Sequence, residues 1–362
     1  MTRWIWRVAW LLLPLAWALH QFAHHDALTF FVSCAALIPL ARTMGNATEV
    51  LAERIGPTAG SLLNATFGNA AELILGIAAL RHGHINLVKG SITGSILGNL
   101  LLVAGASIVT GGVRIQRLRF NKLAASSSVS TLFLAVVAMV VPTLLSSGAR
   151  NFPTGLLSEE ISLVLIAMYG LSLWFQLRTH ADQMTSAREP LLATPAEAAA
   201  AAAHPRVEQP PPIGASLGKL LLAAAATAAA SELLVSAVSG TVQSLHVPET
   251  FVGVIIVAIV GNAAEHSTAL LFAWRGDMDV ALGIAWESSK QIALFVAPVL
   301  VFGGMLLGVP MDLAFTRFEV IALGLAVLAF SLIVLDGETH WLEGAFLLAV
   351  YVVLGMGFYF VG

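Results

Sequence analysis

The chain has 362 residues, of which 58% are hydrophobic and 11% are charged, against roughly 25% charged residues in an ordinary soluble domain. This composition excludes a typical water-soluble protein and predicts a membrane protein. The formal charge of −3 gives no reason to expect a nucleic-acid partner. Cys34 is the single cysteine, which excludes a disulfide framework and a multi-cysteine metal site.

A membrane-spanning helix needs about 20 mostly apolar residues, and eleven segments meet this measure. The first follows Arg3 and Arg7, as in a secretory signal peptide, but the bulky, polar stretch 20–25 offers no small-residue cleavage site. We therefore expect a retained helix, and an all-α membrane protein with eleven transmembrane helices. The segments are 4–21, 28–51, 57–80, 87–111, 124–145, 158–178, 215–243, 249–273, 279–308, 318–335 and 341–361.

One long interruption, rich in proline and alanine, divides the chain after the sixth segment and predicts a linker, with or without a short alanine-rich helix. Corresponding helices of the two halves are then five spans apart. Because five is odd, the halves must have opposite orientations, as in an inverted-topology repeat. The predicted parts are an N-terminal transmembrane helix (1–25), a first five-helix repeat (26–179), a cytoplasmic linker (180–213) and a second five-helix repeat (214–362).

The positive charges indicate the orientation. With the N-terminus in the cytoplasm, most lysines and arginines fall on the cytoplasmic side, and only Arg81, Lys89, Arg150 and Arg317 fall outside. This bias agrees with the positive-inside rule. We predict a multi-pass protein of a bacterial inner (plasma) membrane with a cytoplasmic N-terminus.

The pentapeptide Gly-Asn-Ala-Ala-Glu occurs twice, at 68–72 and at 261–265, and both copies lie inside predicted spans. A carboxylate at the bilayer centre costs a few kcal/mol or more, so an intramembrane acid is a functional hypothesis by default. Glu72 and Glu265 are therefore predicted to face each other across one shared ion site. The repeat extends further at the same offset of 193, which pairs Gly83 with Gly276, Gly90 with Gly283 and Ser95 with Ser288.

Each glutamate shares a helix face with the asparagine three residues before it, Asn69 or Asn262. Carboxylate and amide oxygens are ligands for hard cations such as Ca²⁺. At Gly68 and Gly261 a helix can loosen and free backbone carbonyls around a cavity. Buried carboxylates also bind protons, so cation and protons compete for one site, which together with alternating access is sufficient for antiport. The structural alternative is that these polar residues join helices.

Further polar residues have two interpretations each. Ser95, Asn99, Ser288 and Gln291 follow the motifs and either line the ion path or join helices. His266 either shuttles protons or donates a hydrogen bond. Glu49 and Glu232 are either gating acids or acids solvated at the membrane interface.

The segments around the motifs resemble a known family. Residues 63–74 and 260–266 resemble the two signatures of the calcium/proton exchanger (CAX) family, and 91–97 and 291–296 are similar to the stretches that follow them. The resemblance covers about 40–178 and 214 to the end. It implies eleven helices, a Ca²⁺ site between the motif helices, exchange for protons, and binding of both ions by Glu72 and Glu265.

Two features depart from the family pattern. Glu287 stands where the family usually has a small residue, and Lys290 follows at helical spacing, so we predict an ion pair that is either structural or alters cation choice. The linker has only three glutamates, which makes Ca²⁺ sensing by an acidic helix doubtful.

The leading hypothesis is thus a secondary antiporter that exchanges Ca²⁺, or a similar cation, for protons. A monovalent cation (Na⁺ or K⁺)/proton antiporter on the same scaffold is the near alternative, and a passive channel is weaker because two motifs in one chain favour rocking. An enzyme is not expected, since no His-Glu-x-x-His motif is present. No cofactor is predicted, membrane lipid is an expected partner, and the oligomeric state stays open.

Overall fold

The structure, a computed structural model, describes residues 2–55, 60, 63, 66–148, 153–184 and 212–361. Its first part consists of α1 (Thr2–Ala18), η1 (Leu19–Ala23), α2 (Asp26–Ile55), α4 (Ala70–Arg81), α5 (Ile85–Leu97), η2 (Gly98–Val103), α6 (Ala104–Gly112), α7 (Lys122–Gly148), α8 (Thr154–Trp174), η3 (Phe175–Thr179) and α9 (Ala181–Met184), where η marks π-helical turns.

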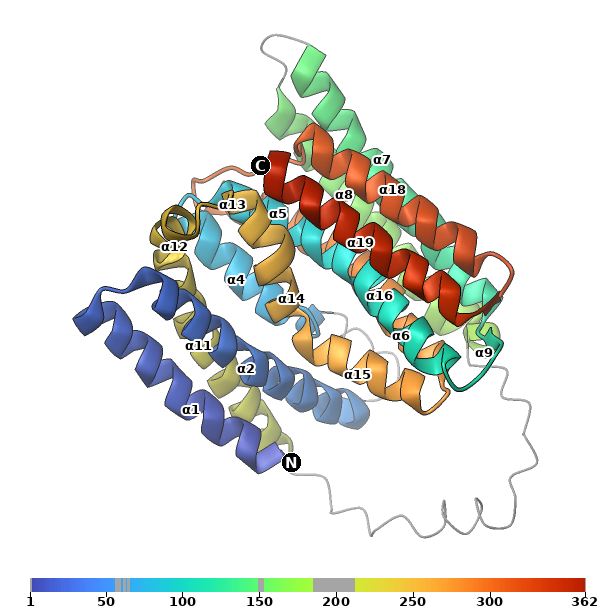
Figure 1. Cartoon of the computed structure of the whole chain (residues 1–362), viewed down its shortest axis with the longest axis horizontal. Coiled ribbons are helices and arrows are strands. Elements are labelled where there is room, and N and C mark those ends of the chain that lie inside the picture. Colours follow the sequence, from blue (N-terminus) through green and yellow to red (C-terminus); the bar gives the residue numbers. More distant parts are fainter. Residues whose placement is uncertain are drawn as a thin grey trace.

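The second part is likewise helical (Figure 1). It consists of α11 (Ile213–Ser236), α12 (Val238–Leu245), α13 (Glu249–Phe251), η4 (Val252–Val257), α14 (Ala258–Gly261), α15 (Ala263–Trp274), α16 (Met278–Gln291), η5 (Ile292–Val296), α17 (Ala297–Leu306), α18 (Arg317–Val334) and α19 (Trp341–Val361). The described strands are two-residue pieces, β1 (Leu118–Arg119) and β2 (Glu338–Thr339), which pair antiparallel with Leu118 opposite Thr339.

The prediction of an all-α, multi-pass membrane protein is confirmed. In the described part of the chain, eight helical segments are long and apolar enough to cross a membrane, or nine if the pair 238–245 and 249–261, bent by 108°, counts as one span. The predicted segments 4–21, 57–80 and 249–273 are not among the eight because their helices are short or broken, and part of 57–80 lies outside the described residues. The number eleven therefore stays a prediction. Most of the predicted linker, including its alanine run, also lies outside the described residues.

The repeated motif extends into repeated geometry. α4 and α15 have the same length, 12 residues, and begin at equivalent positions. Each is followed by a glycine in the left-handed region, Gly83 at φ 78° and Gly276 at φ 83°, a conformation that side chains disfavour. The next helices, α5 and α16, both continue into π-helical turns, η2 and η5. The offset of 193 therefore holds for backbone conformation as well as for sequence.

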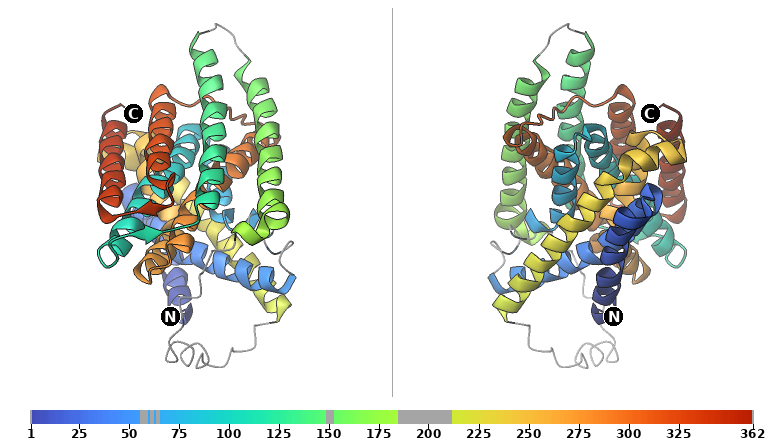
Figure 2. Two further views of the ribbon diagram at one scale, coloured as in Figure 1. Left: turned by 90° about the vertical axis from the view of Figure 1, so that its right-hand side faces the viewer. Right: turned by 90° about the vertical axis from the view of Figure 1, so that its left-hand side faces the viewer.

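The helices form two groups side by side. α1, α2 and α11 lie together, and the remaining spans form the larger group with most of the buried core (Figures 1 and 2). A small apolar cluster with Met44, Leu51 and Leu220 joins α2 to α11. Across the two halves, α5 packs against η4 at backbone distance, because Gly90 and Gly94 present no side chain there.

The bundle has two ends. We call one end the open face, where α2 and α15 end and α16 begins. We call the other end the closed face, where α4 and α17 end and where α5, α13 and α18 begin. The two chain ends lie at opposite faces, with the C-terminal end of α19 at the closed face (Figures 1 and 2).

Candidate cation site

Both motif helices break at the motif. Asn69 precedes α4 with φ −102° and ψ 24°, and Asn262 precedes α15 with φ −95° and ψ 8°, so the helical backbone is interrupted at equivalent residues. Glu72 and Glu265 then lie in the first turn of the helices that follow. The N-terminal turn of a helix carries partial positive charge, which stabilises a carboxylate. Broken helices of this kind are how transporters build ion sites inside a membrane.

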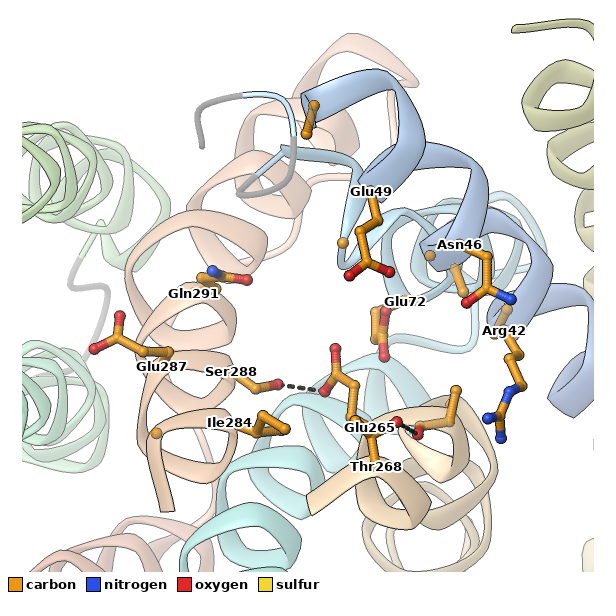
Figure 3. Close-up of a pocket in the computed structure, with 18 of the residues that line it drawn as sticks. Arg42, Asn46, Glu49, Glu72, Glu265, Thr268, Ile284, Glu287, Ser288 and Gln291 are labelled. Atoms are coloured by element: carbon orange, nitrogen blue, oxygen red, sulfur yellow. Dashed lines mark hydrogen bonds between the residues drawn. The ribbon is translucent and has the colours of Figure 1, made fainter. Parts of the chain in front are cut away.

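A large cavity of about 990 Å³ contains both motif glutamates. Gly68 and Gly261 also line it. Figure 3 shows Glu49, Glu72 and Glu265 directed into the same space. Most of the remaining lining comes from α2 between residues 41 and 52, from Thr268 of α15 and from α16 after residue 279. All of these parts lie toward the open face, so the cavity opens there.

Three asparagine amides use their nitrogens to join the two halves. Asn262 Nδ2 donates to Ser95 Oγ at 2.9 Å, and Asn99 Nδ2 donates to Ser288 Oγ at 3.0 Å. Asn69 Nδ2 donates to the side-chain oxygen of Gln291. These three separate contacts each join the first half to the second, and they involve the four predicted pathway residues Ser95, Asn99, Ser288 and Gln291.

The oxygens of these groups remain without a hydrogen bond. Among the described residues, the buried atoms Oδ1 of Asn69, Asn99 and Asn262 and Oε2 of Glu72 have no partner. Buried polar atoms are normally paired, so each exception needs an explanation. All four are acceptors, which is the chemistry that a hard cation requires. Among the described residues, no group of three or more His, Cys, Asp or Glu could hold a metal ion. The ligands that could hold a cation here are the two motif carboxylates and the amide oxygens beside them.

Glu265 is held by a hydroxyl, whereas Glu72 lies at the boundary of the open space. Ser288 Oγ donates to Glu265 Oε2 at 2.8 Å (Figure 3). Glu72 lines the large cavity and also a second pocket of only about 10 Å³, which reaches toward the closed face past Ser95 and Leu300. That volume is about the minimum for one water molecule, so no hydrated ion passes on this side.

Ion pairs join the halves at the closed face. Glu232 accepts from Arg81 at 3.0 Å and contacts His82 at 2.8 Å, and His84 contacts Glu249 at 3.0 Å. For Glu232 the sequence left two interpretations, a gating acid or an acid solvated at the membrane interface. In this conformation it lies outside the cavity and holds the closed face instead, whereas its counterpart Glu49 faces the cavity.

Asp312, in the loop before α18, makes a fourth contact of this kind, with Lys89 of α5 at 2.5 Å. Burial raises the pKa of this carboxyl, but hydrogen bonds from Lys89 and Thr154 and the charge of Lys89 outweigh it and hold the pKa below its ordinary value. Asp312 is therefore ionised at neutral pH and links α5 and α8 to the second half.

The predicted pair of Glu287 and Lys290 is present. Their charged atoms lie 2.7 Å apart, and the side chain of Lys290 is 3% exposed against 34% for Glu287. Ser128 and Gln176, which the sequence analysis did not single out, each donate to Glu287 at 3.2 Å. The carboxylate thus turns away from the cavity toward α7 and η3, although Glu287 belongs to the lining (Figure 3).

Three further polar residues of the cavity were missed from the sequence, namely Arg42, Asn46 and Thr268. Arg42 and Asn46 precede Glu49 by seven and three positions on α2 and form a polar stripe in an apolar span, a signal that helical periodicity could have found. His266 was predicted near the ion path. It is half-buried and lies outside the cavity lining in the described structure.

Comparisons with known proteins agree with this architecture. The sequence model of the family described as sodium/calcium exchanger protein matches residues 25–178 and 215–360. A Ca²⁺/H⁺ antiporter of Synechocystis sp. is 42% identical over 96% of this chain and 95% of its own. The Ca²⁺/H⁺ antiporter ChaA of Bacillus subtilis is 42% identical over 92% of each chain.

Two solved structures have the same architecture. Native YfkE superposes with a TM-score of 0.82 at 38% identity and covers 99% of this chain and 100% of its own. The H⁺/Ca²⁺ exchanger CAX superposes with a TM-score of 0.71 over 98% of this chain and 91% of its own, but at 16% identity this likeness concerns the fold alone.

The fold, the broken motif helices and the related proteins together define the class of this protein. It is a multi-pass membrane transporter and not an enzyme. The chain belongs to the sodium/calcium exchanger protein family, within its calcium/proton exchanger (CAX) branch.

Proposed function

We propose that this protein is a secondary antiporter that exchanges Ca²⁺ for protons by alternating access. The observation that carries the proposal is the meeting of Glu72 and Glu265 in one cavity, beside buried amide oxygens that lack a hydrogen-bond donor. The names of the Synechocystis and Bacillus relatives support Ca²⁺ and H⁺ as the two substrates.

The two motif glutamates bind both substrates in turn. With both carboxylates ionised, they supply two charges and several oxygens to a divalent cation, and Asn69 and Asn262 add their amide oxygens. Protons compete for the same carboxylates, so protonation releases the cation and the cation displaces the protons. Because one site holds either substrate but not both, movement of the site between the two faces couples the two fluxes.

The orientation follows from the charges in the chain. We place the N-terminus and the open face in the cytoplasm of a bacterial cell, with the protein in the plasma membrane, since the arginines and lysines of the loops are concentrated at that face. In this orientation the cavity loads Ca²⁺ from the cytoplasm, and an inward proton gradient drives its export.

The test is cation-dependent proton movement in proteoliposomes that contain the purified protein, with Ca²⁺, Mn²⁺, Na⁺ and K⁺ compared. Ca²⁺ flux should increase with an opposing proton gradient and reverse when that gradient is reversed. The apparent Ca²⁺ affinity should fall as the pH falls, because the ligands must be deprotonated. Cation flux that is indifferent to the proton gradient and to pH between about 5 and 8 would instead indicate a channel.

A second candidate is exchange of a monovalent cation for protons. Lys290 favours it, because the ammonium neutralises Glu287 and so lowers the negative charge around the cavity. Proton movement that follows Na⁺ or K⁺ and ignores Ca²⁺ would select this candidate.

A further inference from the structure

The hydrogen bonds around the two motif glutamates differ between the repeats, although the residues are equivalent. Ser95 of α5 and Ser288 of α16 are 193 positions apart, like the glutamates. Ser288 donates to Glu265 of its own repeat at 2.8 Å. Ser95 instead accepts from Asn262 of the other repeat at 2.9 Å. Among the described residues, Glu72 Oε2 is buried and has no hydrogen-bond partner.

The packing of α5 and α16 also differs between the two repeats. On α5, a Cβ atom at Gly90 would lie 2.9 Å from the carbonyl oxygen of Thr250, so this helix is in close contact at the closed face. On α16, the equivalent Gly283 lines the cavity and has nothing within 4 Å of its Cβ position. One repeat is therefore packed as on a closed side and the other as on an open side.

Two inverted repeats can reach the conformation open to the opposite face when each takes up the arrangement of the other. Applied to the equivalent side chains, this exchange assigns new hydrogen bonds. Ser288 donating to Glu265 becomes Ser95 donating to Glu72. Asn262 donating to Ser95 becomes Asn69 donating to Ser288.

We infer that Ser95 and Ser288 are alternating positioning residues of the cation site. Ser288 orients Glu265 while the cavity is open as in this structure, and Ser95 orients Glu72 when the site is open to the other face. The inference rests on the proposed exchange function and states which hydroxyl supports which carboxylate at each face.

The exchange keeps the number of hydrogen bonds between the two serines and the motif residues. In each conformation one of the two equivalent serines donates to the glutamate of its own repeat and the other accepts from the asparagine of the opposite repeat, and a hydroxyl can do either because it has one donor and two lone pairs. The bond from Asn99 to Ser288 stands outside this exchange, because the position equivalent to Asn99 is Ile292. When Ser95 leaves Asn262, the amide nitrogen keeps its second acceptor, the carbonyl of Ala258, at 3.0 Å. After the change Glu265 is the carboxylate without a serine donor, as Glu72 is in this structure.

Loss of either hydroxyl should therefore weaken Ca²⁺ binding from one face only. Removing a group that orients a metal ligand typically costs about 10- to 100-fold in metal affinity. Ser288→Ala should raise the half-saturating Ca²⁺ concentration at the open face by about tenfold or more, with little change at the closed face. Ser95→Ala should do the reverse, and the maximal rate should change less than the half-saturating concentration in both variants.

The experiment measures Ca²⁺-dependent proton flux in vesicles of both orientations, inside-out and right-side-out, with the full chain and with Ca²⁺ varied on one side at a time. Ser289→Ala is the matched control on α16, because this buried hydroxyl bonds only within its own helix, to Ala285 at 2.9 Å. Ser107→Ala is the control in the first half, a buried serine of α6. Ser→Thr at position 95 or 288 keeps the hydroxyl and should restore the affinity.

The inference is overturned if both alanine variants weaken Ca²⁺ binding at the same face, if each weakens it equally at both faces, or if neither differs from its control. If an alanine variant does not fold, Ser→Cys keeps a weaker donor at the same place and must show the same face-specific loss. A wild-type protein without Ca²⁺-coupled proton flux would refute the proposed function itself, whereas wild-type coupling without face-specific variants would refute only the role of the serines.

Discussion

Glu72 and Glu265 share two structural features. Each carboxylate lies in the first turn of a helix that begins within the bilayer, and each lines the same cavity. The repeated pentapeptide was sufficient to predict this pair, because an acid inside an apolar span is costly without a role. The pairing of the amide nitrogens of Asn69 and Asn262 across the halves could not be predicted, since sequence spacing describes neighbours on one helix only.

Replacing either motif glutamate by glutamine should abolish coupled exchange and leave a folded protein. The amide keeps the shape of the side chain but removes the charge that binds the cation and the proton. Proton and Ca²⁺ fluxes in proteoliposomes measure the loss, and size-exclusion behaviour measures folding. Glu160→Gln on the exposed surface of α8 is the control. Exchange at the wild-type rate in Glu72→Gln or Glu265→Gln would refute a shared site.

The Glu287 and Lys290 pair should show an unequal response to its two single substitutions. Lys290 is the buried partner, so Glu287→Ala leaves an uncompensated charge in the interior, a change that costs up to about 3–5 kcal/mol. Lys290→Ala leaves a carboxylate that is one-third exposed and keeps its donors Ser128 and Gln176. The expected order of thermal midpoints is Glu287→Ala lowest, then Lys290→Ala, with the double change Glu287→Gly and Lys290→Leu above both.

Transport by the double variant separates the two roles of this pair. Unchanged preference among Ca²⁺, Na⁺ and K⁺ would indicate a structural pair, and an altered preference would indicate that the pair tunes the site. If Lys290→Ala and Glu287→Ala both express, melt and transport like the wild type, the ion pair has no role.

At the scale of elements, the contact between α5 and η4 closes one end of the ion path. The two backbones approach so closely that Gly94 has no room for a side chain beside Val254, and Gly90 is nearly as tight beside Thr250. Small residues are a general means of close helix packing in membranes. The equivalent surface of α16 faces the cavity instead, so two helices with related sequences have opposite tasks in this conformation.

Gly90→Ala should lower the thermal midpoint of the purified protein, while Gly283→Ala should leave it unchanged or slightly higher. The added methyl group at Gly90 meets the backbone of Thr250, and overpacking of this kind costs about 1–3 kcal/mol. At Gly283 the methyl group meets nothing within 4 Å, and alanine is about 1 kcal/mol better than glycine within a helix. Equal midpoints for the two variants would contradict the assignment of packed and open helices.

The elements were predictable to unequal degrees. Long apolar runs such as those of α7, α18 and α19 were placed to within a few residues, because length and hydropathy alone define them. The break of 108° between α12 and α13 was not predicted, since it depends on how His246, at φ 55°, turns the chain between two apolar helices. The closed-face partners of Glu232 were equally inaccessible, because Arg81 and His82 are some 150 positions away.

At the scale of the whole molecule, the structure is open at one face and closed at the other. The described ion pairs of the closed face, from Arg81 to Asp312, all join residues of the first half to residues of the second. Opening that face must break such contacts, whereas closing the open face requires only that the walls of the cavity meet. The two halves of the transport cycle are thus resisted by different interactions.

Cysteine labelling should reveal this one-sided access. Cys34 is buried, and Cys34→Ala provides the background. Thr268→Cys lines the cavity and should react quickly with an impermeant thiol reagent added at the open face, and slowly from the closed face. Ser91→Cys lines the small pocket and should react slowly from both. Fast labelling of Ser91→Cys from the closed face alone would show that the protein rests in the opposite conformation.

The difference between the two pockets also determines where an electric field would act. Water in the large cavity conducts the potential of the open face inward as far as Glu72, so most of a transmembrane voltage falls across the thin closed layer around the 10 Å³ pocket. An elementary charge that crosses 100 mV gains or loses about 2.3 kcal/mol. Loading of the site from the cavity would then be nearly insensitive to voltage, and release across the closed layer would carry almost all of the electrical work of the cycle.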